Sequence, residues 1–393
     1  MIIKDVILKE IKGIWGNPPV EGDLSTPVIK TNNMTYEGYI DYDDITYRSI
    51  PKKKLDSCYL KKGDLLVEKS GGTKTHSVGY VNIFDKENNV FVCNNFIVGL
   101  RPDNNIVLSE YLFFQMKFFY ETGIFSDCYN KTTGIQNLQL QTYLSKSIVC
   151  PEKAEQEKVV ATLNNIVKAL ANKNEQLKKL DELIQSKFYE MFGDPITNEK
   201  EWDVKTFGNL FNTILGKMLD KKKQIETDIS LPYLGNANVQ WGYFIFENLN
   251  TMTFTRKEIE KFNLQVGDLL ICEGGESGRC AIWKGSSQEI LFQKAIHRAR
   301  VKNENEINPQ FVAMLLKVLK FNGGLKKYVS QSTIEHLTGV KLSLVPIICP
   351  PFYLQQAFAS YVEKVEEAKA IVNQEIAYLQ ELLDSRMDFY FRK

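Results

Sequence analysis

Two long segments of the chain carry hydrophobic residues spaced seven apart, with further hydrophobic residues three positions after some of them. This is the a and d pattern of a coiled coil, so the sequence predicts long helices over 151–193 and 351–393. The residues expected to form the seam between the helices are Leu163, Ile166, Leu170, Leu177, Leu180 and Ile184 in the first, and Val362, Val365, Val372, Ile376, Leu379 and Leu383 in the second. At about 1.5 Å per residue, each helix is roughly 60 Å long, which is more than one domain can cover. The periodicity alone fits an oligomerising coiled coil as well as an intramolecular pair.

The segments between these helices have a different pattern. Short apolar runs rich in β-branched and aromatic residues and bounded by Gly, Asn and Asp predict strands at 64–70, 89–100, 268–274 and 280–285. Two longer apolar segments, 109–123 and 309–324, each predict one buried helix. The fold class is therefore α+β, with two tandem mixed domains that are each followed by a long helix.

The whole arrangement occurs twice in the chain. With an offset of 199 and no gap, identical residues recur in the second half for Ile135, Leu138, Ile148, Cys150, Pro151, Gln156, Leu180 and Ser186. The Gly-Asp-Leu-Leu of 63–66 recurs at 267–270. This repetition indicates a tandem duplication. It predicts a first domain over 1–150, a central helix over 151–193, a second domain over 194–350 and a C-terminal helix over 351–393. A duplicated chain favours pairing of its own two helices, as an antiparallel coiled coil.

Composition and charge narrow the class of protein but do not indicate a function. The 49 basic and 48 acidic residues nearly cancel, so the net charge does not indicate a nucleic-acid partner, and the short lysine runs also suit solvated faces. Seven cysteines without a Cys-x-x-Cys pair predict reduced thiols rather than a zinc site. Without a long apolar run or a signal-peptide pattern, the protein is expected to be cytoplasmic and not bound to a membrane.

Motifs for catalysis are incomplete in this sequence. The Asn-Pro-Pro of 17–19 is typical of adenine methyltransferases, but Val20 stands where an aromatic residue would hold the flipped base. The Gly-Gly-Thr-Lys-Thr of 71–75 has the wrong order for a phosphate-binding loop, and no pair of the three histidines has metal-ligand spacing. Asp194, Asp203 and Lys205 lie in a linker, which does not favour a nuclease site. We therefore expect a chain that is not itself an enzyme and that has no metal site.

The order of motifs closely resembles that of the specificity subunit of type I restriction-modification enzymes. Each half has a Gly-Asp-Leu-Leu domain, an Ile-x-x-Leu segment, a Val-Cys-Pro or Ile-Cys-Pro junction, a Gln and a long helix. The second half opens with "EWDVKTFGNLFNTILGK", which looks like the usual start of a domain in that family, whereas "MIIKDVILKEIKGIWGN" matches it poorly.

The resemblance implies two target recognition domains, each reading one half of a bipartite double-stranded DNA sequence, with the paired helices as a ruler. It also implies docking of two methyltransferase subunits, which methylate adenine N6, and of restriction subunits. S-adenosylmethionine, ATP and Mg would then act in those partner subunits, and this chain would need no cofactor. The alternative is a coiled-coil assembly scaffold with two protein-binding domains. Retention of genomic fragments on a filter separates the two, because a scaffold shows no dependence on DNA sequence.

Two polar loops in each half offer groups suited to DNA contacts. Lysine and arginine suit phosphates, and amides, hydroxyls and arginine suit base edges. In the first half the candidates are Lys69, Thr73, Lys74 and His76 after the Gly-Asp-Leu-Leu strand, and Lys131, Thr132 and Thr133 before the Ile-x-x-Leu segment. In the second half they are Arg279, Ser330, Gln331, Ser332 and Thr333.

Overall fold

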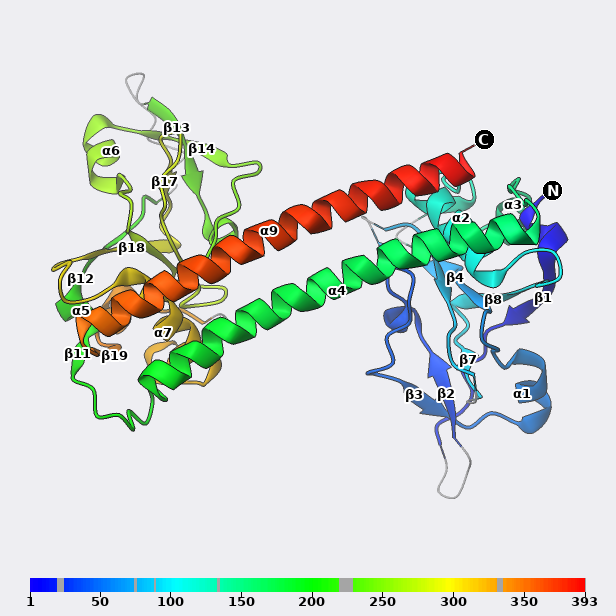
Figure 1. The fold of residues 1–393 in the computed structure, drawn as a ribbon, viewed down its shortest axis with the longest axis horizontal. Coiled ribbons are helices and arrows are strands. Elements are labelled where there is room, and N and C mark those ends of the chain that lie inside the picture. Colours follow the sequence, from blue (N-terminus) through cyan, green and yellow to red (C-terminus); the bar gives the residue numbers. More distant parts are fainter. Residues whose placement is uncertain are drawn as a thin grey trace. The chain divides into compact units, whose positions relative to one another are not determined.

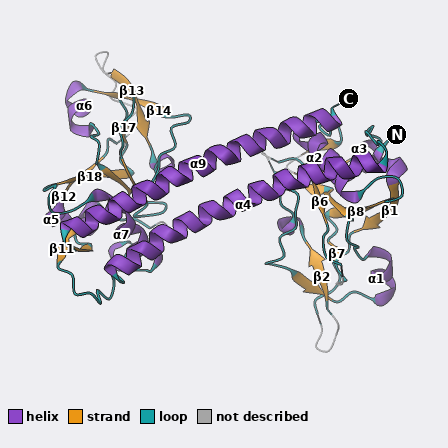
Figure 2. Ribbon diagram, viewed as in Figure 1, coloured by secondary structure: helices purple, strands orange, loops and turns teal. Residues whose placement is uncertain are grey.

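The computed structural model of the chain describes residues 1–19, 25–73, 76–87, 90–132, 135–218, 229–330 and 335–392 (Figure 1). It divides into two units, of which the first is Met1–Asn174 with Gln374–Lys393 and the second is Glu175–Asn373. Each unit contains one mixed domain and a part of each long helix. Figure 2 shows strands and short helices in both domains, which confirms the predicted α+β class.

The first domain is built on a four-stranded antiparallel sheet in the order β1-β8-β4-β6. The strand that begins with the two leucines of Gly-Asp-Leu-Leu is buried at every position, as the apolar run predicts. The main-sheet strands are β1 (Ile7–Lys12), β4 (Leu65–Glu68), β6 (Val81–Ile83) and β8 (Ile97–Pro102). The predicted buried helix is α2 (Ser109–Glu121), whose aromatic face joins the same core.

Two smaller sheets also lie in the described part of the first domain. One has the order β3-β2-β7, and the other the order β5-β10-β9. Their strands are β2 (Thr26–Ile29), β3 (Thr46–Arg48), β7 (Val92–Cys93), β5 (Ser70–Gly71), β9 (Tyr129–Thr132) and β10 (Ile135–Leu138). The short helices of this domain's described residues are η1 (Ile3–Val6), η2 (Thr31–Asn33), α1 (Lys52–Cys58) and α3 (Leu140–Leu144).

The second domain repeats the main sheet and the sheet built on β2, and its strands β11 and β19 form a separate two-stranded sheet. Its main sheet has the order β12-β18-β15-β16, and β13 pairs with β14 antiparallel and with β17 parallel, as β2 does with β3 and β7. The strands are β11 (Val204–Thr206), β12 (Phe211–Leu215), β13 (Ile229–Leu234), β14 (Asn250–Phe254), β15 (Leu269–Cys272), β16 (Cys280–Ile282), β17 (Leu291–Phe292), β18 (Ile296–Val301) and β19 (Pro346–Ile348). The helices are α5 (Phe207–Leu210), η3 (Asn236–Asn238), α6 (Arg256–Phe262), α7 (Pro309–Phe321), η4 (Lys326–Tyr328) and α8 (Gly339–Ser343).

The two domains also begin alike, although their first residues match poorly in sequence. Strand β1 pairs with β8 as β12 pairs with β18, antiparallel in both cases. The structure therefore extends the duplication to the start of the first domain, where the sequence comparison lost it.

Both long helices form and pack closely, as predicted. They are α4 (Lys153–Phe192) and α9 (Phe352–Phe391), with 40 residues each. In the first unit, Leu163 and Ile166 share a core with Leu383 and Phe391. In the second unit, Ile184 and other α4 residues share a core with Val362 and Val365. The contacts run from the start of one helix to the end of the other, so the pair is antiparallel.

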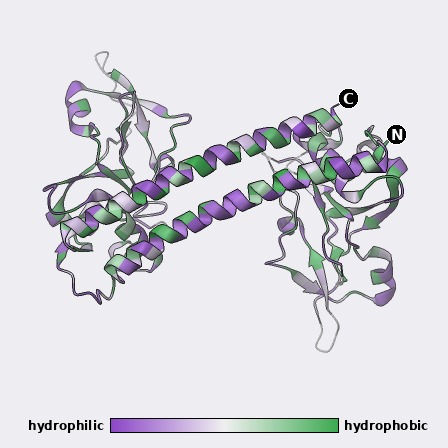
Figure 3. Ribbon diagram, in the orientation of Figure 1, coloured by the Kyte–Doolittle hydropathy of each residue, from purple (hydrophilic) through white to green (hydrophobic). Residues whose placement is uncertain are grey.

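The residues expected in the helix seam are all shielded from solvent to some degree, and Figure 3 shows hydrophobic positions recurring along both helices. The buried ones are Leu163, Ile166, Ile184, Val362, Val365, Val372 and Leu383. The half-buried ones are Leu170, Leu177, Leu180, Ile376 and Leu379. Near the helix ends, the seam continues into aromatic residues, with Phe188, Phe192, Phe358 and Phe391 almost fully buried.

The repeated glutamine fastens each long helix to the domain before it. The Gln156 side chain is fully buried. Its Nε2 donates to the carbonyl oxygens of Pro151 at 2.8 Å and Ile106 at 3.0 Å. Its Oε1 accepts from the amide of Leu108, the N-cap residue of α2, at 2.8 Å. Gln156 therefore joins the start of α4 to the start of the buried helix.

Gln355 makes the same three contacts in the second unit. Its Nε2 donates to Pro350 and Glu306 at 2.7 and 3.2 Å, and its Oε1 accepts from Asn308, the N-cap residue of α7, at 2.9 Å. A fully buried amide with its hydrogen bonds satisfied fixes one geometry, because leaving any of these groups unpaired costs about 1–3 kcal/mol. The duplicated Gln thus sets how each helix leaves its domain.

The aspartate of each Gly-Asp-Leu-Leu motif forms a bidentate ion pair with an arginine on an inner strand of the main sheet, β8 or β18. Asp64 accepts from Arg101 Nε at 2.8 Å and from Nη2 at 2.7 Å. Asp268 accepts from Arg300 Nε and Nη2, both at 2.7 Å. Each aspartate is only 1% exposed. The motif therefore carries a buried charge pair besides a turn and a strand.

The seven cysteines are free thiols, and burial raises the pKa of Cys272 to about 11. Within the described ranges no helix is both long and apolar enough to span a membrane. The same residues contain no group of three or more His, Cys, Asp or Glu arranged to hold a metal ion.

Candidate nucleic-acid interface

In the first domain, the two loop regions predicted to face DNA meet in one small sheet. Strand β5 follows the Gly-Asp-Leu-Leu strand, and it pairs with β10, which pairs with β9. The Ser70 hydroxyl donates to Asn137 Oδ1 at 2.7 Å across the first of these pairs. Two segments about 65 residues apart in sequence thus lie side by side.

The described candidate residues of the first loop lie between β4 and β5 and in the turn after β5. Lys69 is half-buried, and its backbone joins the sheet by bonds to Phe96 and Leu138. Thr73 is exposed, and it closes a turn in which its hydroxyl accepts from the His76 amide at 2.9 Å. Lys74 lies outside the described residues.

The candidates of the second loop lie in the hairpin of β9 and β10. Lys131 and Thr132 end β9, where they pair with Gln136 and Ile135. Thr133 is outside the described residues. The structure therefore brings the backbone of this hairpin next to the first loop, and Gln136 Oε1 accepts from the Val78 amide at 3.1 Å to join them.

A buried carboxylate lies behind the first loop. Glu68 is 6% exposed, and burial raises the pKa of its carboxyl group above the usual value. A side chain at Gly71, whose φ is +131°, would place its Cβ 2.6 Å from Glu68 Oε1. Glycine is therefore required here both for the backbone angle and for the close approach of the carboxylate.

The second domain has the same meeting of two loops. Gly274 forms an antiparallel bridge with His336, and the Leu337 amide donates to Glu273 O at 2.7 Å. Two hydrogen bonds of 3.1 Å join Ser330 to His336. The His336 amide donates to the Ser330 hydroxyl oxygen, and the Ser330 amide donates to His336 O. Gln331, Ser332 and Thr333 lie between these residues, outside the described residues.

The Arg279 side chain contacts other residues around its own loop. Its Nη1 contacts Glu276 Oε2 at 3.3 Å, and its Nη2 donates to Asn236 O at 2.8 Å. The side chain is 14% exposed. Asn236 in turn donates to Gly274 O at 2.9 Å. In this geometry Arg279 braces the loop that follows β15.

A third segment, which the loop patterns did not single out, joins the candidate surface in both domains. In the first domain, the Tyr36 ring stacks on the His76 ring with 3.8 Å between centroids and 17° between planes. In the second, Trp241 Nε1 donates to Glu276 Oε1 at 2.7 Å. Each aromatic residue follows the 3-10 helix after the first strand of the small mixed sheet, η2 or η3. The two segments also resemble each other in sequence, with "NNMTYEGY" at 32–39 and "NANVQWGY" at 236–243.

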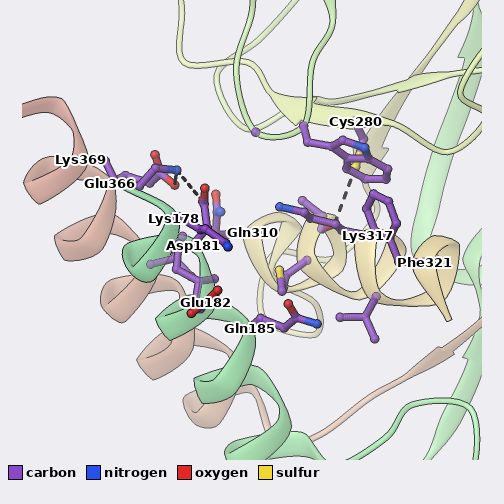
Figure 4. A pocket seen from close by; sticks show the side chains of 17 residues that line it. Lys178, Asp181, Glu182, Gln185, Cys280, Gln310, Lys317, Phe321, Glu366 and Lys369 are labelled. Carbon is purple, nitrogen blue, oxygen red and sulfur yellow. Dashed lines mark hydrogen bonds and ion pairs between the residues drawn. The ribbon is translucent and has the colours of Figure 1, made fainter. Parts of the chain in front are cut away.

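The second unit also has a pocket of about 470 Å³ between α7, Trp241 and parts of α4 and α9 (Figure 4). Lys369 closes one side, bonded to Asp181 and Glu366 at 2.9 Å each. Ala313, the fifth residue of α7, lines the pocket. The fifth residue of the equivalent helix α2 in the first unit is the larger Phe113. The Phe113 ring packs so close to Gly38 that an added Cβ there would lie 2.4 Å from it. The two units therefore differ here, because an alanine lines the pocket where the first unit has a phenylalanine.

Comparison with known proteins agrees with this duplicated organisation. The family model for the type I restriction modification DNA specificity domain matches residues 17–182 and again residues 199–381. A search of curated protein sequences gave no match.

Two solved structures are similar over nearly the whole chain. One is described as the type I restriction-modification system S subunit from M. genitalium, with 18% identity, a TM-score of 0.53, and coverage of 100% of this chain and 95% of that chain. The other comes from work described as the structural basis of complex assembly and conformational transition of the type I R-M system, with 15% identity, a TM-score of 0.59, and coverage of 99% and 96%. At such identities they establish a shared fold.

Proposed function

Because the chain belongs to the type I restriction-modification DNA specificity family, we propose that it is the DNA-recognition subunit of such a system and reads a bipartite double-stranded DNA target, with one half-site for each mixed domain. The observation that carries this proposal is the repeated meeting of two loops. The same framework holds them in both domains, through β5 and β10 in one and the Gly274–His336 bridge in the other. The loop residues differ, as two different half-sites require.

The proposed partners supply the chemistry. Two methyltransferase subunits and the restriction subunits dock on this chain, and S-adenosylmethionine, ATP and Mg act in those subunits. Support comes from the family match and from the similar chain described in terms of type I complex assembly. The chain itself positions the assembly on DNA, in the cytoplasm, without a catalytic residue or cofactor of its own.

We expect the purified chain alone neither to methylate nor to cleave DNA, and to confer sequence-specific adenine methylation once its cognate methyltransferase subunits are added. Methylome sequencing of a strain with and without this chain identifies the target. Methyl transfer by the chain alone would contradict the proposal. Two results together would favour the alternative, a coiled-coil assembly scaffold. Methylation would be complete without the chain, and the chain would retain genomic fragments without regard to their sequence.

The loops should read their half-sites independently. Gln331→Ala is expected to weaken or relax recognition of one base in the second half-site by about 1–3 kcal/mol, because Gln can bond to adenine through two hydrogen bonds. Lys131→Ala acts on the first half-site if Lys131 contacts guanine. If Lys131 contacts phosphate, the substitution weakens binding to all sequences alike. It then also reduces the slope of log affinity against log salt concentration by about one.

The measurement is binding to single-base variants of both half-sites at two or more salt concentrations. The controls are Gln356→Ala and Lys168→Ala, which change exposed side chains on α9 and α4. If the folded loop variants keep wild-type affinity and every base preference, these loops do not read the DNA.

A further inference from the structure

The segment that carries Tyr36 forms a tight turn in the first domain. Met34 and Ile40 make an antiparallel bridge, and the Thr35 amide donates to Tyr39 O at 3.1 Å. The Thr35 hydroxyl accepts from the Tyr39 amide at 3.2 Å. Asn82 on β6 donates to Tyr39 O as well. These bonds fix the backbone of Tyr39 without using its side chain.

The second domain has the matching turn. Val239 and Phe244 make the bridge, and the Gln240 amide donates to Tyr243 O at 2.9 Å. The Gln240 side chain donates to Ala237 O at 2.8 Å. Tyr243 therefore occupies the backbone position that Tyr39 occupies in the first domain.

Both tyrosine side chains extend into solvent to the same degree. Tyr39 and Tyr243 are each 59% exposed. Among the contacts of the described residues, neither hydroxyl has a hydrogen-bond partner. A single exposed aromatic residue needs no explanation. The same residue type at the same place and exposure in two domains whose candidate loop residues differ indicates a shared role.

The turns are joined to the candidate reading loops. Tyr36, three residues before Tyr39, stacks on His76 of the first loop. Trp241, two residues before Tyr243, bonds to Glu276 of the loop after β15. Each tyrosine is thus presented beside the loops that the proposed function assigns to DNA.

We propose that Tyr39 and Tyr243 are DNA-backbone contacts, each donating its hydroxyl hydrogen to a phosphate oxygen beside its half-site. The inference rests on the proposed function and extends it. Tyrosine is among the side chains that bond to phosphates, and such bonds set register without reading sequence. The phosphate backbone is the part of DNA that is alike at two different half-sites. It suits identical residues at matched positions, whereas base edges require the unlike residues of the loops.

The test is binding of the full chain, alone and with its methyltransferase subunits, to duplexes that carry the methylated target. Tyr39→Phe and Tyr243→Phe each remove one hydroxyl and keep the ring. Each is expected to weaken binding about tenfold, the effect of losing one hydrogen bond to a charged group. The loss should be the same for every base variant, and the two losses should multiply in the double variant. The salt slope should stay unchanged, because a neutral donor displaces no counterion.

Tyr378→Phe is the matched control, since Tyr378 is 66% exposed on α9, and thermal unfolding checks that each variant folds. If the wild-type chain prefers its target and both turn variants bind with unchanged affinity, the tyrosines do not contact phosphates. The proposed function is then still intact. Altered preference at a single base also overturns it, because that result marks a base contact. A wild-type chain with no sequence preference defeats the proposed function and this inference together.

Discussion

Replacing Asp64 with alanine is expected to lower the free energy of unfolding of the first unit by about 3 kcal/mol. The substitution leaves Arg101 without its carboxylate partner, and breaking a buried ion pair in this way costs about 3–5 kcal/mol. The lower end applies because the Arg101 side chain is 18% exposed and keeps its bond to Tyr59 O. The loss should exceed that from Asp56→Ala, an exposed control on α1.

The two units provide a matched comparison for this measurement. Asp268→Ala should destabilise the second unit instead, because Asp268 and Arg300 form the equivalent pair. In urea unfolding followed by tryptophan fluorescence, Trp15 reports on the first unit, and the other three tryptophans lie in the second. Asp64→Ala with Arg101→Leu should cost less than the sum of the single changes, because it leaves no unpaired charge. Additive costs would show that the pair does not act as a unit.

The same substitutions should affect recognition one half-site at a time. At a temperature where only the destabilised unit unfolds, Asp64→Ala should lose discrimination at the first half-site and keep it at the second, and Asp268→Ala should do the reverse. The measurement is binding to base variants of each half-site. Simultaneous loss at both half-sites in either variant would argue against independent readers.

Lengthening both long helices by seven residues is expected to change the spacer of the DNA target and leave both half-sites unchanged. The insertions belong within α4 near Asn174 and within α9 near Asn373, where each helix passes from one unit to the other. Seven helical residues add about 10 Å, which corresponds to roughly three base pairs at 3.4 Å each. A whole heptad keeps the hydrophobic seam facing its partner.

Insertions of three residues provide the control for this prediction. They rotate one end of a helix by about 300°, which moves the seam away from its partner, and should lower activity rather than retarget it. Methylome sequencing gives the spacer directly. If every active length variant methylates the original spacer, the helices do not measure the distance between half-sites.

Most of the framework was predictable from the sequence because it depends on periodicity and repetition. The spacing of seven marked α4 and α9, and the buried run after Gly-Asp-Leu-Leu marked β4 and β15. The Asp64–Arg101 pair was not predictable in this way. Its partners lie 37 residues apart, and the spacing is 32 in the second domain, so no fixed offset aligns both ends.

The candidate surface was only partly predictable, for a different reason. The sequence identified two loops in each domain, but it did not show that Arg279 is held by Glu276 and Asn236. It also did not single out the aromatic turns. Whether Tyr39 is core or surface depends on which face of the fold it occupies, and periodicity does not decide that for a single residue in a turn.

The last turns of α9 have a consequence for the order in which the protein is made. Phe391 is 2% exposed, and its ring centroid lies 5.4 Å from that of Tyr111 and 6.0 Å from that of Phe118. The first unit therefore lacks part of its core until Phe391 leaves the ribosome, whereas the second unit ends at Asn373. At about 5–20 residues per second, the N-terminal domain waits roughly 10 to 45 s after Asn174 is synthesised. A frameshift shortly before the codon of Phe391 would thus damage the domain that is encoded first.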